Sequence, residues 1–216
     1  MANKGTTSSK KKKVAPKRVA AATKVKTSAN SIYQRLNKWN IGLAVLHALQ
    51  GVAVIVLSKS ATLPVNTHFL TLDSLATEAT GRPILASATR HLFDINLAYL
   101  VAAFFFMSAI AHIIIATVYR KKYEANLKKG MNKARWIEYA LSAGTMMVAI
   151  SLLSGIYDLS SLIMIFGLTA VMNLMGLVME VHKQANKKNN WLSYIAGCVA
   201  GILPWAVEAV YLKGEA

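Results

Sequence analysis

Five long apolar stretches alternate with polar segments along this chain of 216 residues, and none of the five contains a lysine or arginine. They run over residues 41–58, 95–119, 137–153, 159–179 and 191–212. Each is close to the roughly 20 residues that an α-helix needs to cross the hydrocarbon core of a bilayer. The pattern predicts an all-α membrane protein, in which residues 39–216 form a bundle of five transmembrane helices.

The polar segments have two different characters. Residues 1–38 are rich in lysine, alanine, threonine and serine, which predicts a disordered basic tail without a core. Residues 59–93 form an outer loop, and its part 64–72 has β-favouring residues in partial alternation, which predicts a short hairpin outside the membrane. The composition agrees with a helical membrane protein, since 55% of residues are hydrophobic and the mean hydropathy is +0.39.

The positive charges predict the orientation in the membrane. Of the 25 lysines and arginines, 21 lie in the tail and in segments 120–136 and 180–190, which are alternate polar segments. Positively charged segments stay in the cytoplasm. We therefore expect a multi-pass protein with a cytoplasmic N-terminus and its C-terminus outside. The basic tail should contact anionic lipid headgroups. A nucleic-acid-binding tail is the weaker alternative, and no nucleic acid is expected as a partner.

Carboxylates are almost absent from the apolar stretches, which contain only Glu138 and Glu208. A carboxylate in a membrane helix is costly and marks a candidate functional position. Glu138 follows Arg135 by three residues, so the two share a helix face. Either they form an ion pair at the membrane boundary or Glu138 is a functional carboxylate. Glu208 is expected to face a water cavity or to reach outward, and Glu180 to pair with a cation at the interface.

Two histidines, His47 and His112, lie within the first and second apolar stretches. Both should occupy the cytoplasmic half of the bundle, at a depth similar to that of Glu138. Such a group could move or store a proton. Alternatively, each histidine forms a hydrogen bond to a neighbouring helix. The spacing matches no local metal motif, so no metal is expected.

The last apolar stretch contains Gly197 and Gly201, a small-xxx-small pair that allows close helix contact. The partner is either a neighbouring helix of the same chain or a second copy. The single cysteine, Cys198, is expected to pack as a small apolar residue. No motif of a soluble enzyme is present, and the chain is not expected to be an enzyme.

Several segments together resemble the heliorhodopsins, retinal-binding photoreceptors whose membrane orientation is inverted relative to other microbial rhodopsins. The resemblance covers residues 41–212 in order and spacing. Its most specific part is Arg-Trp-Ile-Glu-Tyr-Ala-Leu-Ser at 135–142, and the others are Leu-His-Ala-Leu-Gln-Gly at 46–51, Ser-Ala-Ile-Ala-His at 108–112, the segment 166–180, and Gly-Ile-Leu-Pro-Trp at 201–205.

The resemblance implies roles for these residues. Glu138 would be the counterion of the protonated Schiff base of all-trans-retinal, and His47 and His112 would belong to the polar cluster near it. The outer loop would form a β-ribbon that helps to build a homodimer. The protein would be a light sensor, built on the first five helices of a seven-helix fold.

One feature departs from this pattern. The family attaches retinal to a lysine in the seventh helix, whereas this sequence has five apolar stretches without a lysine. We therefore expect a chain truncated after the fifth helix that does not hold retinal covalently. Two other hypotheses come from different classes: a complete five-helix scaffold or binding protein with a basic tail, and a small proton or ion transporter or channel.

Overall fold

The computed structural model describes residues 16–186, 188 and 191–214. Five of its helices are long and apolar enough to cross a membrane. They lie in α1 (Pro16–Leu57), α3 (Leu97–Ala116), α5 (Lys133–Leu153), α6 (Leu159–Asn186) and α7 (Trp191–Gly214). The predicted membrane bundle of five helices is therefore confirmed.

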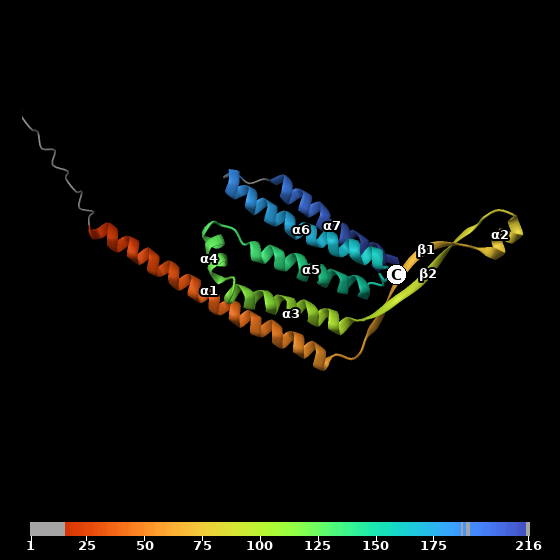
Figure 1. Cartoon of the computed structure of the whole chain (residues 1–216), viewed down its shortest axis with the longest axis horizontal. Coiled ribbons are helices and arrows are strands. Elements are labelled where there is room, and N and C mark those ends of the chain that lie inside the picture. Colours follow the sequence, from red (N-terminus) through yellow and green to blue (C-terminus); the bar gives the residue numbers. More distant parts are fainter. Residues whose placement is uncertain (1–15, 187, 189–190, 215–216) are drawn as a thin grey trace, which may run out of the picture.

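The helices pack in chain order, α1 against α3, α3 against α5, α5 against α6, and α6 against α7 (Figure 1). Small residues allow the close contacts. Gly51 on α1 faces the ring of Phe106 on α3, and Gly144 on α5 faces the ring of Phe166 on α6. The apolar faces that remain exposed are normal for helices that lipid surrounds.

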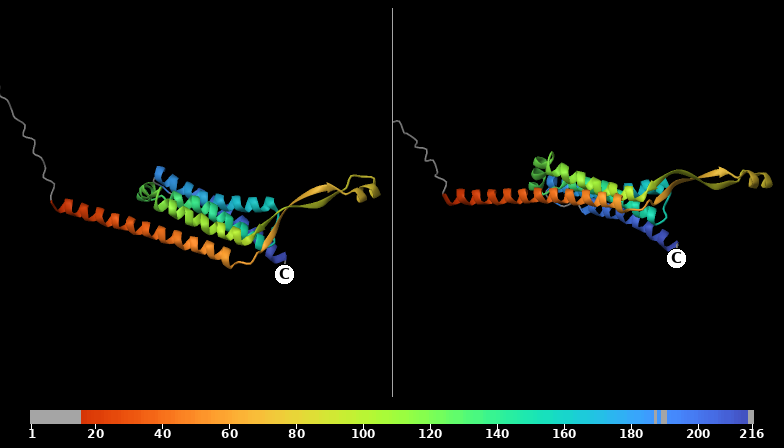
Figure 2. Two further views of the ribbon diagram at one scale, coloured as in Figure 1. Left: turned by 60° about the horizontal axis from the view of Figure 1, so that its bottom comes forward. Right: turned by 90° about the horizontal axis from the view of Figure 1, so that it is seen from below.

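Helix α1 begins far earlier than its apolar stretch. The tail expected to be disordered is helical from Pro16 onward, and residues 1–15 lie outside the described residues. Proline suits the first turn of a helix, and neither glycine nor proline occurs between Lys17 and Ile41. Alanine and lysine in this segment also favour helix. Both orientations in Figure 2 show α1 extending well past the other helices.

At the opposite end, a two-stranded antiparallel ribbon projects from the bundle (Figure 1). It consists of β1 (Thr62–Leu72) and β2 (Leu85–Asn96), joined by the short helix α2 (Ser74–Thr80). A hairpin is present, but residues 64–72, expected to form it, supply only its first strand, and the second strand is 85–96. The second membrane helix consequently starts at Leu97 rather than 95, where the Asn96 side chain accepts a hydrogen bond from the backbone N–H of Ala98 at 3.0 Å.

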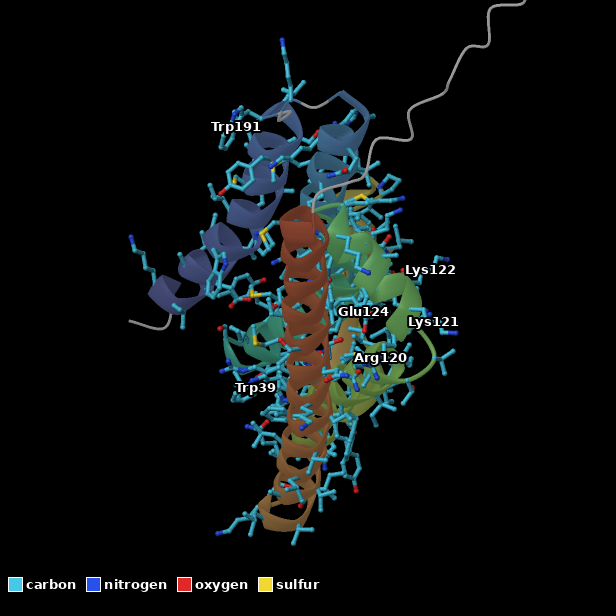
Figure 3. All side chains as sticks on the ribbon, turned by 90° about the vertical axis from the view of Figure 1, so that its left-hand side faces the viewer. Trp39, Arg120, Lys121, Lys122, Glu124 and Trp191 are labelled. Atoms are coloured by element: carbon cyan, nitrogen blue, oxygen red, sulfur yellow. The ribbon has the colours of Figure 1, made fainter. Side chains whose placement is uncertain are left out.

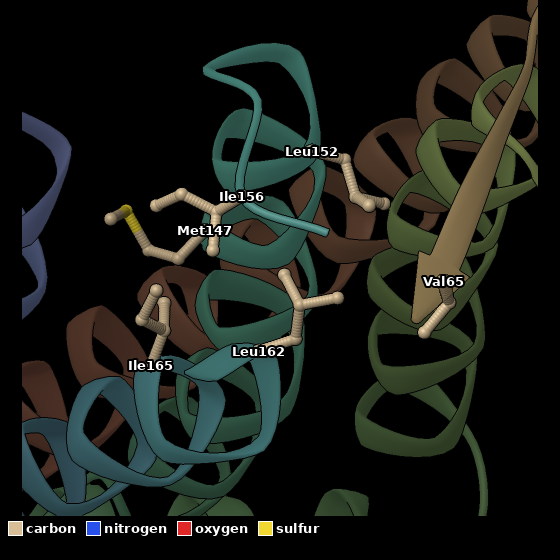
Figure 4. Close-up of a cluster of buried hydrophobic side chains, with 6 residues drawn as sticks. All are labelled: Val65, Met147, Leu152, Ile156, Leu162 and Ile165. Carbon is tan, nitrogen blue, oxygen red and sulfur yellow. The ribbon is translucent and has the colours of Figure 1, made fainter. Parts of the chain in front are cut away.

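The root of the ribbon is attached to the bundle by a buried apolar cluster. Figure 4 shows its members: Val65 of β1, with Met147, Leu152, Ile156, Leu162 and Ile165 of α5, α6 and their connection. A backbone hydrogen bond of 2.8 Å from Asn66 to the carbonyl of Tyr157 adds to this attachment. The ribbon therefore forms one packed unit with the ends of α5 and α6.

Segment 120–136, expected to be a basic loop, contains a further helix, α4 (Arg120–Lys128). Arg120 and Glu124 form an ion pair of 3.0 Å along it. Lys121 and Lys122 are exposed and point away from the bundle in Figure 3. Basic residues thus gather at the end of the bundle opposite the ribbon (Figure 1).

Candidate functional site

Glu138 lies on α5 and faces α3, where Ser108 donates a hydrogen bond of 2.6 Å from its Oγ to Glu138 Oε1. Ser108 is buried, and Glu138 is half-buried. The sequence hypothesis of an ion pair between Arg135 and Glu138 is wrong, because Arg135 bonds elsewhere. Glu138 is therefore a membrane-helix carboxylate with a hydroxyl donor, positioned between two helices.

Arg135 forms its ion pair with Glu180 of α6, at 3.1 Å between Nη2 and Oε1. The second carboxylate oxygen of Glu180 accepts a hydrogen bond of 2.7 Å from the backbone N–H of Asn132, just before α5 begins. The expected pairing of Glu180 with a cation is confirmed. Because Glu180 takes the charge of Arg135, Glu138 is left without a paired cation among the described residues.

His47 and His112 lie side by side between α1 and α3. Their rings are stacked, with centroids 5.8 Å apart and planes 13° from parallel. Nδ1 of His112 is 2.9 Å from Oδ1 of Asn40, and Nδ1 of His47 is 3.0 Å from Oε1 of Gln50. Each histidine therefore has an amide partner on α1.

Two cavities adjoin Glu138. One of about 390 Å³ is almost entirely apolar and is lined from α3 and α5 by residues including Met107, Ile110, Ile114 and Leu141. The other, of about 190 Å³ and named the polar cavity here, has a mixed lining in which Glu138 lies near polar residues: Asn40, His112, Tyr123, Asn132, Arg135 and Tyr139. Glu138 lines both cavities, so it stands between an apolar space and one that polar groups share.

Tyr123 of α4 closes the polar cavity toward the basic end. Burial raises the pKa of the Tyr123 phenol above its ordinary value of 10.0, opposed by a side-chain hydrogen bond with Asn132 and by the charge of Arg135. Tyr123 therefore stays a neutral hydrogen-bonding group through the physiological pH range. It holds α4 against the start of α5.

The structure brings together the three residues singled out from the sequence, Glu138, His47 and His112. His112 is close to Asn40, and His47 is close to Gln50. Sequence reasoning did not assign roles to Ser108, Asn40 or Tyr123. For Ser108 a signal was available, because it precedes His112 by four residues and so shares its helix face. For Asn40 and Tyr123 nothing local indicated which helix they would face.

Five candidate spans, with ionisable side chains gathered between α1, α3 and α5, define a multi-pass membrane protein with a polar site inside its bundle. The comparison with protein families identifies it further: residues 36–216 match the heliorhodopsin family, and the chain belongs to that family. No curated protein matches the sequence.

Proposed function

We propose that this protein is a light-sensing heliorhodopsin in which Glu138 stabilises the positive charge of a retinal chromophore. The observation that carries the proposal is the position of Glu138, a membrane-helix carboxylate without a paired cation that lines an apolar cavity of about 390 Å³. An opposite charge close to a protonated imine favours its charged form. Bound as a protonated Schiff base, retinal would supply a cation that absorbs visible light.

The described residues fit one part of such a site. The apolar walls around Met107, Ile110 and Leu141 suit a polyene, and Glu138 suits a cationic imine. His47 and His112 lie beside the polar cavity and are proposed to accept or hold a proton there. For covalent attachment the five apolar stretches offer no lysine. A lysine that forms an imine must be buried, so that its amine is desolvated.

The test uses the purified chain and two forms of the chromophore. With free all-trans-retinal we expect no red-shifted band sensitive to hydroxylamine, because none of the lysines in the described part of the chain is buried and able to form the imine. With the preformed Schiff base of all-trans-retinal and a short alkylamine we expect a red-shifted band, because Glu138 keeps the imine protonated.

The variant Glu138→Gln should lose the red-shifted band, whereas Glu180→Gln should keep it. Glu180 is the matched control, because it is a carboxylate of the same bundle that pairs with Arg135 instead. A band that survives in Glu138→Gln would remove Glu138 from the counterion role. No band with the wild-type chain would mean that these helices do not form the chromophore site.

We further propose that the ribbon builds a homodimer. Phe69, Leu70, Leu72 and Leu85 are exposed on it, although a two-stranded ribbon alone is marginally stable in water. Covering these side chains with a second copy would stabilise both ribbons. Replacing Leu70 and Leu72 by serine should reduce cross-linked dimer in membranes at least severalfold, whereas Val118→Ser at the opposite end should not. Equal cross-linking in both variants would contradict the ribbon interface.

For the orientation, we propose that the basic end lies in the cytoplasm and the ribbon outside. The basic tail would then lie beside the anionic headgroups of the cytoplasmic leaflet, together with the exposed lysines of α4.

A further inference from the structure

Glu208 is the most deeply buried carboxylate of the described residues, with an exposed fraction of 2%. It lies on α7, four residues after the fully buried Pro204, near the end of the bundle from which the ribbon projects. It is remote from Glu138, because Ser151, the residue it contacts, follows Glu138 by 13 positions on α5, a rise of about 20 Å. The sequence hypotheses that Glu208 faces a water cavity or reaches outward are both wrong.

Ser151 is the hydrogen-bonding partner of Glu208, and it is fully buried. Its Oγ contacts Oε1 of Glu208 and also lies 2.9 Å from the backbone carbonyl oxygen of Met147. A serine hydroxyl has a single hydrogen and can donate only one full hydrogen bond. It therefore cannot satisfy both oxygens as a donor.

A proton on Glu208 resolves this conflict. The carboxylic acid then donates to Ser151 Oγ, and Ser151 donates to the carbonyl of Met147. Without that proton, two buried acceptors compete for one hydrogen, and one of them is a charged carboxylate. Its other oxygen, Oε2, is buried and has no hydrogen-bonding partner among the residues that the structure describes.

Among the residues that the structure describes, no cation forms an ion pair with Glu208. The outer half of α6 from Leu159 to Thr169 and the neighbouring part of α5 contain no charged residue. Asp158 is acidic and caps α6, because its Oδ2 accepts hydrogen bonds from the backbone N–H of Ser161 at 2.8 Å and from Ser161 Oγ at 2.9 Å. Lys213, five residues after Glu208 on α7, is exposed. An isolated charge in this apolar region would be costly.

We propose that Glu208 is a proton-binding site, and that the bound proton joins α7 to α5 through Ser151. Helix α7 packs mainly on α6, through Gly197 and Gly201 against Met172 and Met175. The Glu208–Ser151 contact therefore joins α7 to α5, a helix with which α7 has few other contacts. Loss of the proton would put a charge there that requires water, and the end of α7 would separate from α5.

Infrared spectroscopy of the full chain in lipid tests the protonation. At neutral pH we expect a carboxylic C=O band that shifts in heavy water and is lost in Glu208→Gln. Glu180→Gln, which removes an ion-paired carboxylate, is the control and should keep it. Ser151→Ala should move the band without removing it, since the acid loses its acceptor but keeps its proton. A spectrum in which Glu208→Gln removes no carboxylic band would overturn the proposal.

Hydrogen exchange tests the consequence for α7. When the pH is raised until the band disappears, the protection of the amides in residues 205–212, which is their exchange rate compared with the intrinsic rate at the same pH, should fall in the wild-type protein and stay constant in Glu208→Gln. Glutamine carries no charge at any pH, so it keeps the neutral contact. An equal fall in protection in both proteins would show that the proton on Glu208 does not hold α7. Neither readout involves retinal, so the result is independent of the proposed light-sensing function.

Discussion

Single small residues set how closely neighbouring helices approach, and at Gly176 the neighbour is a rigid aromatic ring rather than a flexible side chain. A Cβ atom added there would lie 2.4 Å from ring atoms of Trp136 on α5. The ring cannot retreat freely, because the guanidinium of Arg135 lies over it at 4.5 Å, and Arg135 is in turn held by Glu180. The indole is thus fixed between α6 and the ion pair, rather than standing free at the membrane boundary.

We therefore expect Gly176→Ala to destabilise the protein by about 1–3 kcal/mol, the usual cost of forcing extra volume into a packed interface. Its matched control is Gly167→Ala on the same helix, where an added Cβ meets nothing within 4 Å. That variant should be neutral or slightly stabilising, because alanine favours helix over glycine. Thermal unfolding in one detergent compares the two. Equal losses would show that the indole moves aside at little cost.

Between elements, Glu180 connects the start of α5 to α6. It pairs with Arg135 and also accepts from the backbone of Asn132, whose own side chain caps α5 by accepting from the N–H of Arg135 at 3.2 Å. The Glu180 carboxylate thus pairs with the charge of Arg135 and also accepts a hydrogen bond at the N-terminus of α5, where anionic groups are favourable.

Replacing Glu180 by alanine should lower the free energy of unfolding by about 1–2 kcal/mol, since the part-buried N–H of Asn132 and the cation of Arg135 both lose their acceptor. The ion pair contributes only a small part of this free energy, because the Arg135 side chain is 41% exposed and water screens its charge. Glu124→Ala, which breaks the ion pair within α4 alone, should cost less than half as much. Chemical denaturation monitored by tryptophan fluorescence measures both variants. A larger loss for Glu124→Ala would contradict this ranking.

The elements differ in how well the sequence predicted them. The five membrane-spanning helices were predicted correctly, because the length of an apolar run can be read directly from the local sequence. The start of α3 was missed by two residues, because Ile95 is apolar and yet belongs to β2, where pairing with Leu63 decides its conformation. Helix α4 was missed because its polar sequence is typical of a loop as well, and its packing through Tyr123 depends on residues beyond it.

The sequence identified the ionisable residues of the candidate site, but it did not identify the residues that they contact. Glu138, His47 and His112 stand out within apolar stretches. The partner of Arg135 is 45 residues away, and the near neighbour Glu138 was the wrong choice. Similarly, Glu208 lies 57 residues from Ser151. Sequence spacing identifies neighbours on one helix, whereas contacts between helices depend on rotation about each axis, which the apolar pattern leaves open when lipid surrounds most faces.

The whole molecule is elongated, and its basic elements and its ribbon lie at opposite ends of the long axis. The basic helix α4 and the extended part of α1 lie at one end, and the ribbon lies at the other (Figure 1). Positive charge resists transfer across the membrane during insertion, so the basic end should remain in the cytoplasm. The ribbon, which exposes both polar and apolar side chains, would then stand in the outer aqueous space.

Cysteine labelling in intact cells distinguishes the two orientations. Cys198→Ala removes the single native cysteine, and Glu78→Cys on α2 or Lys121→Cys on α4 then adds an exposed one. An impermeant maleimide should label the α2 cysteine at least tenfold more than the α4 cysteine. After the cells are opened, both should react equally, which controls for their intrinsic accessibility. Preferential labelling on α4 in intact cells would reverse the orientation, and the end of the bundle that carries α4 would then face the outside rather than the cytoplasm.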